Sequence, residues 1–501
     1  MFLGLAGLAG CDAAERPGTP PRDVLLITVD TLRADHLSAW LYPLPTSHLP
    51  SSDEDRIAGR DLSLDDLARE GAMFTRAFAP RGQTFPSVAT LMTGATPFEH
   101  GAVDNRDLLP GGVETLAERF QEAGFATGAF TANRLLVPGS GIEQGFEHFF
   151  PMPAEVPELY GDPGIDRDYR VLVEANQWID AQRASDPDRP LFTWIHLMGP
   201  HLPYEPLPLG SSGPDYATLF ADPNYAGEAD GSRAFLDTAY ATGRALDGED
   251  VARVVAHYDA EIARINRLIS LFLLVYGRID RDDEPRYLDS TLLVFAADHG
   301  EELYQRNRYW AHSKSVYSSV LHVPLFFRHP ASLTGQRSFG EVVTLSDVAP
   351  TIADWMQLDP LDGASGRSLL PIVDSYVELP FDSRPAFGHW RDSIFTVTDG
   401  DWRLVWNPQS VEPDDPPVGP YPIPPLALFD LERDPLELFD VSAEEPDQVR
   451  RLLDMLQAWT VTQPIDTERQ RTLGVERARA LRALGYIDGE EEEAAEADGE
   501  Q

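Results

Sequence analysis

Two acidic residues, a histidine and a threonine stand at points of the sequence where strands and helices are expected to begin or end. Asp30 directly follows a short apolar run, and Asp298 and His299 directly follow another. Thr84 lies just before a segment typical of a helix start, where the helix dipole and free N–H groups favour an anion. Two carboxylates, an imidazole and a hydroxyl that converge on one point would form a metal site with an alcohol at its edge.

A parallel sheet would bring these residues together. Continuous apolar runs typical of buried parallel strands recur at residues 23–30, 125–131, 191–197, 291–297 and 323–327. Helical patterns lie between them at 62–70, 113–123 and 251–274. The alternation predicts an α/β fold, a doubly wound sheet with helices on both faces and its chemistry at the carboxyl ends of the strands. The segment 204–250, rich in Pro, Gly, Asp and Ala, is predicted to be a long surface excursion.

Composition and charge exclude several classes of function. The 501 residues include 82 Asp and Glu against 40 Lys and Arg, a formal net charge of −42. Such a charge repels phosphate backbones, so no nucleic-acid partner is expected. A single cysteine, Cys11, excludes intrachain disulfides and zinc sites built from several cysteines. The hydrophobic content of 43% is sufficient for a large packed core.

The first eleven residues predict a lipoprotein signal. Leu8-Ala9-Gly10-Cys11 has the form of a bacterial lipobox, in which the Cys is lipidated; the alternative is a chance apolar N-terminus with a buried Cys. The run is short and has no preceding Lys or Arg, which a start codon called too far downstream would explain. We expect residues 12–22 to be a Pro-rich tether and 488–501 an acidic disordered tail. The protein would then be lipid-anchored in a bacterial cell envelope, facing the periplasm or the outside.

A longer series of motifs resembles the sulfatase family of the alkaline phosphatase superfamily. The stretch 84–94 is similar to the family signature, in which Cys or Ser precedes x-Pro-Ser-Arg and Thr-Gly follows. Further motifs occur in the family's order at 29–36, 100–101, 199–204, 258–262, 298–302, 323–325, 347–351, 428–431 and 434–435. The resemblance implies an alkaline phosphatase-like mixed, mostly parallel sheet in a catalytic domain at 23–382. It also implies a smaller C-terminal α+β subdomain at 383–487, beside the active-site mouth.

Several residues depart from the family pattern. The family makes its formylglycine nucleophile from Cys or Ser, whereas this chain has Thr84, whose extra methyl group prevents that conversion. Val88 replaces the signature's Arg, Asn133 replaces a lysine, His312 aligns with a sulfate-contacting lysine, and His299 stands where many sulfatases carry Asn. A formylglycine hydrate releases sulfate by elimination, but a phospho-threonine can be attacked directly by water or an acceptor alcohol. The departures therefore favour a phosphorus ester.

The resemblance and these departures imply a role for each candidate residue. The expected ligands of one divalent ion are Asp30, Thr84, Asp298 and His299. The mixed oxygen and nitrogen set favours Mn²⁺ or Zn²⁺, with Ca²⁺ as the alternative. The expected catalytic residues are Thr84 as nucleophile and His312 or His201 as proton donor. The expected substrate-binding residues are Arg81, Asn133 and Lys314.

Three other residues receive no catalytic role. Arg33 and Asp35 could pair with each other or with the site, and neither is assigned to the metal. His196 lies within an expected strand, so we interpret it as a core imidazole with satisfied hydrogen bonds.

Three classes of function remain open. The first is a hydrolase or group transferase that acts on a phosphate ester through a covalent Thr84 intermediate. The second is a sulfatase that works without formylglycine, and the third is an inactive surface lipoprotein with the sulfatase fold. The substrate could be a small molecule, a glycan ester or a lipid ester, and the sequence predicts no oligomeric state.

Overall fold

The computed structural model describes residues 20–48, 62–152, 167–209, 215–242, 244–277, 287–306, 310–333, 337–374, 384–390, 393–408 and 423–463. Cys11, most of the expected tether, both expected limits of the C-terminal subdomain and the acidic tail at 488–501 lie outside these residues. Within them, no helix combines the length and the apolarity that crossing a bilayer requires.

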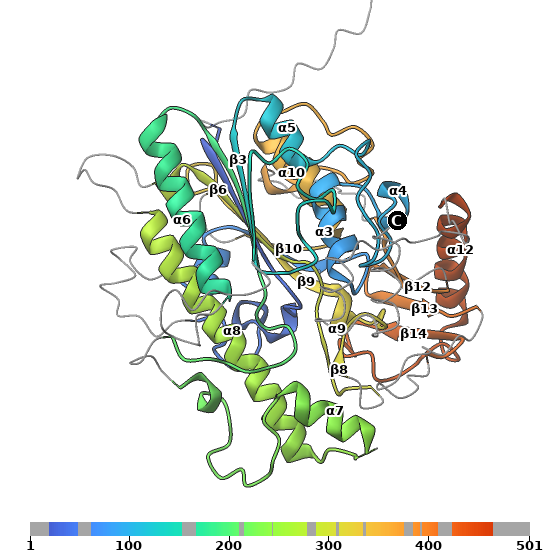
Figure 1. The fold of residues 1–501 in the computed structure, drawn as a ribbon. Helices are drawn as coiled ribbons and strands as arrows, with labels where there is room; N and C mark the ends of the chain where they lie inside the picture. The colour runs from blue at the N-terminus through green and yellow to red at the C-terminus, as the bar shows by residue number, and fades with distance from the viewer. Residues whose placement is uncertain are drawn as a thin grey trace, which may run out of the picture.

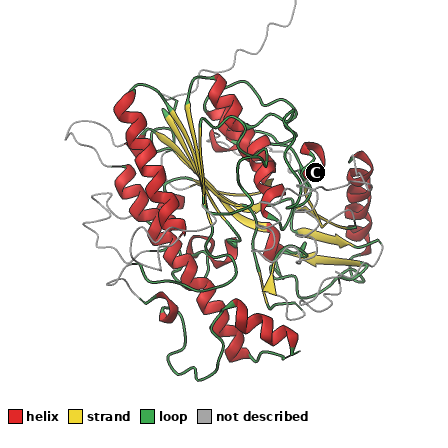
Figure 2. Cartoon of the chain, in the orientation of Figure 1, coloured by secondary structure: helices red, strands yellow, loops and turns green. Residues whose placement is uncertain are grey.

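A large twisted sheet runs through the centre of the catalytic part (Figures 1 and 2). Its strand order is β10 (Arg337–Thr344), β2 (Ala72–Phe78), β9 (His322–Arg328), β6 (Thr291–Ala297), β1 (Asp23–Val29), β5 (Leu191–Leu197), β3 (Ala126–Thr131), β4 (His148–Pro151). Seven of these described strands run parallel to one another, and β9 runs antiparallel to both of its neighbours. The mixed, mostly parallel α/β sheet is therefore confirmed.

The middle strands β1, β5 and β6 are buried along their whole length. Their continuous apolar sequences follow from this, because a strand covered by helices on both faces has no solvent side. The expectation that 323–327 is another parallel strand is wrong, since β9 reverses direction. Strands β2, β4 and β10 were not predicted, because polar residues interrupt their apolar pattern, as Thr75 and Arg76 do in β2.

Helices cover both faces of the sheet (Figure 1). The long helices α6 (Arg167–Ser185) and α8 (Gly248–Tyr276) pack together on one face. The other face carries α3 (Thr84–Thr93), α5 (Leu116–Glu122) and α10 (Val348–Trp355). Shorter α-helices are α2 (Leu64–Arg69), α4 (Pro97–His100), α7 (Arg233–Ala241), α9 (Ser318–Leu321) and α11 (Leu370–Asp374). Single 3₁₀ turns are η1 (Ala34–His36), η2 (Ser38–Trp40), η3 (Tyr216–Thr218), η4 (Tyr287–Asp289) and η5 (Leu345–Asp347).

The C-terminal part forms a separate, smaller sheet, as expected. Its four antiparallel strands are β11 (Ala386–Trp390), β12 (Ile394–Asp399), β13 (Trp402–Trp406) and β14 (Leu426–Asp430). Helix α12 (Pro446–Thr462) packs on this sheet and buries Leu452 and Leu456 in its apolar core. We call the described residues 384–463 the C-terminal subdomain.

The expected surface excursion at 204–250 is only partly exposed. Its first residue, Tyr204, is fully buried, and Leu236 of α7 is buried as well. Gly231 has a positive φ of 73°, and its carbonyl accepts a hydrogen bond from the Tyr204 N–H. The segment therefore folds back against the catalytic domain.

Candidate active site

Asp30, Asp298 and His299 meet at the carboxyl end of the central sheet. Strands β1 and β6 are parallel neighbours, and their register pairs Val29 with Ala297. Asp30 and Asp298 directly follow these two residues, so they lie beside each other. All three side chains are fully buried, and one ligand atom of each lies within 4.8 Å of the other two. The structure thus brings together three of the four predicted metal ligands.

The carboxylates of this cluster fit a bound cation. Oδ1 of Asp30 and Oδ2 of Asp298 are buried and accept no hydrogen bond from the described part of the chain. Burial and the adjacent Asp30 carboxylate raise the pKa of Asp298 well above its usual value. Two unpartnered carboxylate oxygens in a buried site are costly, and a divalent cation would neutralise them. The residues present therefore fit the divalent ion that the sequence resemblance implies.

His299 is oriented as a metal ligand. Its Nδ1–H donates to the carbonyl oxygen of Gly300 at 3.0 Å, an assignment that leaves the lone pair on Nε2. Nε2 lies 3.5 Å from Oδ2 of Asp298 and 3.8 Å from Oδ1 of Asp30. Burial, reinforced by nearby His312, lowers the pKa of His299 to about 3, so the ring is neutral at physiological pH. A neutral imidazole with a fixed tautomer is the form that binds metals.

Thr84 presents its hydroxyl to this cluster from the first turn of α3. The side chain is fully buried, and Oγ1 lies 3.4 Å from Oδ2 of Asp30 and 3.5 Å from Nε2 of His299. Helix α3 begins at Thr84, with Gln83 as its N-cap, so the positive end of the helix dipole faces the same point. The predicted nucleophile therefore lies within reach of the candidate metal ligands.

Two further residues hold the Asp30 carboxylate. Nδ2 of Asn133 donates to Oδ2 of Asp30 at 2.6 Å, and Nε2 of His196 lies 3.5 Å from the same oxygen. Burial opposes ionisation of Asp30, but His196 and the nearby His201 and His299 hold its pKa below the usual range. Asn133, expected to bind substrate, thus contacts a candidate metal ligand; a substrate contact stays a prediction.

The sequence interpretation of His196 captured only half of its environment. The ring is fully buried, and its Nδ1 lies 2.9 Å from Oγ1 of Thr28, as a core imidazole would be. Its other nitrogen, however, faces Asp30. The strand register explains this contact, because β5 pairs His196 with Thr28, two residues before Asp30.

A histidine and a glutamate form a buried pair beside the metal cluster. Nδ1 of His312 lies 2.9 Å from Oε1 of Glu301, and both side chains are buried. The hairpin of β7 (Glu302–Leu303) and β8 (Trp310–Ala311) causes this contact, because its register pairs Glu302 with Ala311. Burial raises the pKa of Glu301 to about 7 and lowers that of His312 to about 4. Sequence reasoning assigned Glu301 no role, since its partner is fixed only by this register.

The third imidazole of the site belongs to His201. Its ring centroid lies 5.1 Å from that of His312, which in turn lies 4.4 Å from His299. The Nδ1–H of His201 donates to the carbonyl of Leu202 at 2.7 Å, and its buried Nε2 has no hydrogen-bond partner among the residues the structure describes. Burial lowers the pKa of His201. Both predicted proton donors therefore lie next to the candidate metal ligands.

The remaining basic candidates have other surroundings. Arg81 is buried, with its Nε bonded to Gln83 at 2.6 Å and Nη2 3.7 Å from Asp104. Lys314 is half-buried, two residues after His312 in the same loop. Whether either of them binds substrate stays a prediction.

Arg33 and Asp35 pair with each other, one of the two alternatives the sequence left open. Nη2 of Arg33 lies 2.7 Å from Oδ2 of Asp35. Nη1 of Arg33 also donates to the carbonyl oxygen of Glu301 at 3.0 Å. The pair therefore fixes the backbone of the loop that carries Glu301.

Known proteins resemble the chain over most of its length. The family model described as Sulfatase matches residues 22–358. An arylsulfatase of Clostridium perfringens is 24% identical, over 86% of this chain and 93% of that protein.

Solved structures share the fold at low identity. A protein bound to its substrate D-glucosamine-2-N,6-O-disulfate superposes with a TM-score of 0.64 at 17% identity, covering 90% of this chain and all of the other. A phosphonate monoester hydrolase of Agrobacterium radiobacter gives a TM-score of 0.62 at 21% identity, covering 88% and 96%.

Proposed function

Because the chain belongs to the sulfatase family, and is thus a metal-dependent ester hydrolase, we propose that it cleaves a phosphate ester through a covalent intermediate on Thr84. The observation that carries the proposal is the buried Thr84 hydroxyl, 3.4 Å from a carboxylate that also fits a metal. A threonine nucleophile suits phosphorus, because water can attack a phospho-threonine at phosphorus without any elimination step. The resemblance in fold to a phosphonate monoester hydrolase is consistent with this choice.

Asp30, Asp298 and His299 would hold the divalent ion. When bound, the ion supplies positive charge that lowers the pKa of a neighbouring hydroxyl and stabilises charge on an ester oxygen. The mixed oxygen and nitrogen ligands favour Mn²⁺ or Zn²⁺ over Ca²⁺. Asn133 and His196 both contact Oδ2 of Asp30 and keep the carboxylate in place.

Thr84 Oγ1 gives up its proton to solvent and attacks the phosphorus, and the bond between phosphorus and the leaving oxygen breaks. The leaving oxygen takes a proton from an imidazole, for which His312 is the better placed candidate. Burial raises the pKa of Glu301 to about 7, so the contact between its Oε1 and Nδ1 of His312 holds a proton of its own, and Nε2 of His312 carries the proton that is donated. Water then attacks the phospho-threonine at phosphorus and loses a proton, the bond from phosphorus to Oγ1 breaks, and Oγ1 takes up a proton as phosphate is released. His201 is the alternative donor, through its unpartnered Nε2 when the ring is protonated.

Brief incubation with 4-nitrophenyl phosphate, followed by high-resolution mass spectrometry of the Thr84 peptide, tests the proposal. We expect a phosphoryl adduct on Thr84 and a loss of turnover on the order of 10³-fold or more in Thr84→Ala. Thr84→Ser is the matched control, because it keeps the hydroxyl and should retain measurable activity. Full activity in Thr84→Ala would sink the mechanism.

A sulfate ester is the second candidate substrate, because the relatives include an arylsulfatase and the fold matches a protein bound to a sulfated glucosamine. With 4-nitrophenyl sulfate in the same assay, a sulfo-threonine adduct would favour this class, and high resolution separates it from phosphorylation. Binding of Mn²⁺ or Zn²⁺ without an adduct or turnover from either ester would favour an inactive member of the family.

We further propose that the protein is a lipoprotein of a bacterial cell envelope, anchored through Cys11 and facing the periplasm or the outside. The proposal rests on the lipobox form of residues 8–11, which precede the described residues. Expression in a bacterium with an alkyne-tagged fatty acid should label the wild type and leave Cys11→Ala unlabelled. Equal labelling of both would overturn the assignment.

A further inference from the structure

Glu437 is a buried carboxylate that the C-terminal subdomain directs toward the catalytic domain. Its residue is only 2% exposed, whereas its neighbours Leu436 and Leu438 are 42% and 50% exposed. Its φ of +55° is the left-handed conformation, which a residue with a side chain adopts at a cost. A buried charge on a strained backbone persists only where its surroundings compensate for it.

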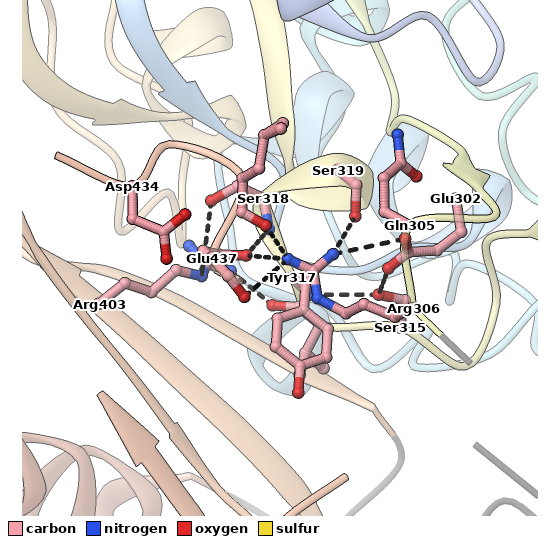
Figure 3. Close-up of polar contacts among 12 residues, drawn as sticks. Glu302, Gln305, Arg306, Ser315, Tyr317, Ser318, Ser319, Arg403, Asp434 and Glu437 are labelled. Atoms are coloured by element: carbon pink, nitrogen blue, oxygen red, sulfur yellow. Dashed lines mark hydrogen bonds and ion pairs between the residues drawn. The ribbon is translucent and has the colours of Figure 1, made fainter. Parts of the chain in front are cut away.

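Two arginines and the start of a helix provide that compensation (Figure 3). Nε of Arg403, from β13, lies 3.0 Å from Oε1 of Glu437, and Nη2 of Arg306 lies 3.4 Å from Oε2. The backbone N–H and the hydroxyl of Ser318, the first residue of α9, each donate to the Glu437 carboxylate at 2.8 Å. One carboxylate of the C-terminal subdomain is therefore bonded to two points of the catalytic domain, Arg306 and Ser318.

Arg306 connects Glu437 to the loop that carries Glu301 and His312. Its Nη1 lies 3.5 Å from Oε2 of Glu302, the residue that follows Glu301. Oε1 of Glu302 accepts a hydrogen bond from the Ser315 hydroxyl at 2.7 Å (Figure 3). The Ser315 N–H in turn donates to the carbonyl of His312 at 2.9 Å. The chain of contacts thus ends on the backbone of His312.

We propose that Glu437 is a positioning residue for proton donation by His312. It fixes Arg306 and the start of α9, and these hold the two strands of the β7–β8 hairpin in the register that joins His312 to Glu301. The inference rests on the proposed function, in which His312 protonates the leaving oxygen. The C-terminal subdomain then contributes to the chemical step from outside the metal site.

The test compares esters that need a proton donor to different degrees. 4-Nitrophenolate leaves without protonation, whereas phenolate is a poorer leaving group that gains from a general acid, typically 10²- to 10⁴-fold. In the full-length protein, Glu437→Gln should lower kcat for phenyl phosphate at least tenfold more than kcat for 4-nitrophenyl phosphate. The affinity for Mn²⁺ and the KM of both esters should change less than threefold. If the wild type hydrolyses only sulfate esters, phenyl sulfate and 4-nitrophenyl sulfate replace the two phosphates in this assay.

Asp399→Asn is the matched control, because Asp399 pairs with Arg451 inside the C-terminal subdomain. It should leave the ratio of the two kcat values unchanged. Arg306→Gln breaks the same link from the catalytic side and should reproduce the effect, which covers the case in which Glu437→Gln does not fold.

Equal losses on the two esters, or no loss, in whichever of these variants folds would overturn the positioning role. Activity that survives Thr84→Ala would instead overturn the proposed function, while a selective loss on phenyl phosphate would still support the role of Glu437.

Discussion

The carboxamide of Asn133 donates to Oδ2 of Asp30 across 2.6 Å, while Oδ1 of the same carboxylate accepts no hydrogen bond from the described residues. One oxygen is thereby fixed to the protein and the other is left for a cation. Asn133 follows strand β3, and Asp30 follows β1, so two strands separated by β5 cooperate in orienting one ligand. Partners that orient metal ligands in this way contribute substantially to metal affinity.

Replacing Asn133 with alanine should weaken metal binding. We expect the Mn²⁺ or Zn²⁺ affinity of Asn133→Ala to fall 10- to 100-fold, the usual cost of losing such a partner. Competition with a chromogenic chelator measures it. Asn407→Ala is the control, because Asn407 is also buried and bonds a backbone carbonyl, that of Ile423, but lies in the C-terminal subdomain. An unchanged affinity in Asn133→Ala would contradict the orienting role.

Glu301 and His312 should contribute jointly to the turnover of a phenyl ester. Glu301→Gln keeps an acceptor for Nδ1–H but removes the charge that stabilises an imidazolium, so we expect kcat to fall at least tenfold. His312→Gln should cost about 10²-fold or more, and the double variant little beyond that, because groups that work together are not additive. Steady-state kinetics of the four proteins gives the coupling. Losses that simply multiply would show that the two residues act independently.

Gly300 leaves no room for a side chain. A Cβ at this position would lie 2.3 Å from the carbonyl oxygen of Ser319 and 3.0 Å from Cγ of Arg33. Gly300→Ala should therefore lower the free energy of unfolding by about 1–3 kcal/mol and also reduce activity, since it displaces the loop between His299 and Glu301. Gly248→Ala at the start of α8 meets no atom within 4 Å and should be neutral or slightly stabilising. Urea titrations of both variants test this contrast.

His329 should make the fold less stable in mild acid. Burial, and then the neighbouring Arg328, lower its pKa to about 4, against about 6.5 in an unfolded chain. The unfolded state therefore binds more protons between these values, and stability falls as the pH drops from about 6.5 toward 4. His329→Asn can keep the hydrogen bond that Nδ1 makes with Ser332 but cannot titrate. As the pH drops over this range, the free energy of unfolding of His329→Asn should fall by on the order of 1–3 kcal/mol less than that of the wild type. Parallel curves for the two proteins would exclude the effect.

Local sequence was sufficient for the elements whose pattern is continuous. The runs that became β1, β5 and β6 were predicted within a residue of their limits, because a strand buried on both faces must be apolar throughout. Asp30, Asp298 and His299 could be assigned to one site for a related reason, since the carboxyl ends of parallel strands share one edge of the sheet. Strand β9 shows the limit, because apolar character does not encode direction.

Contacts that depend on register or on distant segments required the tertiary structure. Glu301 meets His312 only through the pairing of Glu302 with Ala311, and His196 faces Asp30 only because of how β5 aligns with β1. Glu437 reaches the catalytic domain from more than 100 residues downstream, through a turn with positive φ. The sequence by itself therefore predicted the chemistry, a metal site with a threonine hydroxyl, and named the side chains that the structure brings together. The tertiary structure decided which side chains orient that chemistry, because register and domain packing arise from interactions summed over the whole fold.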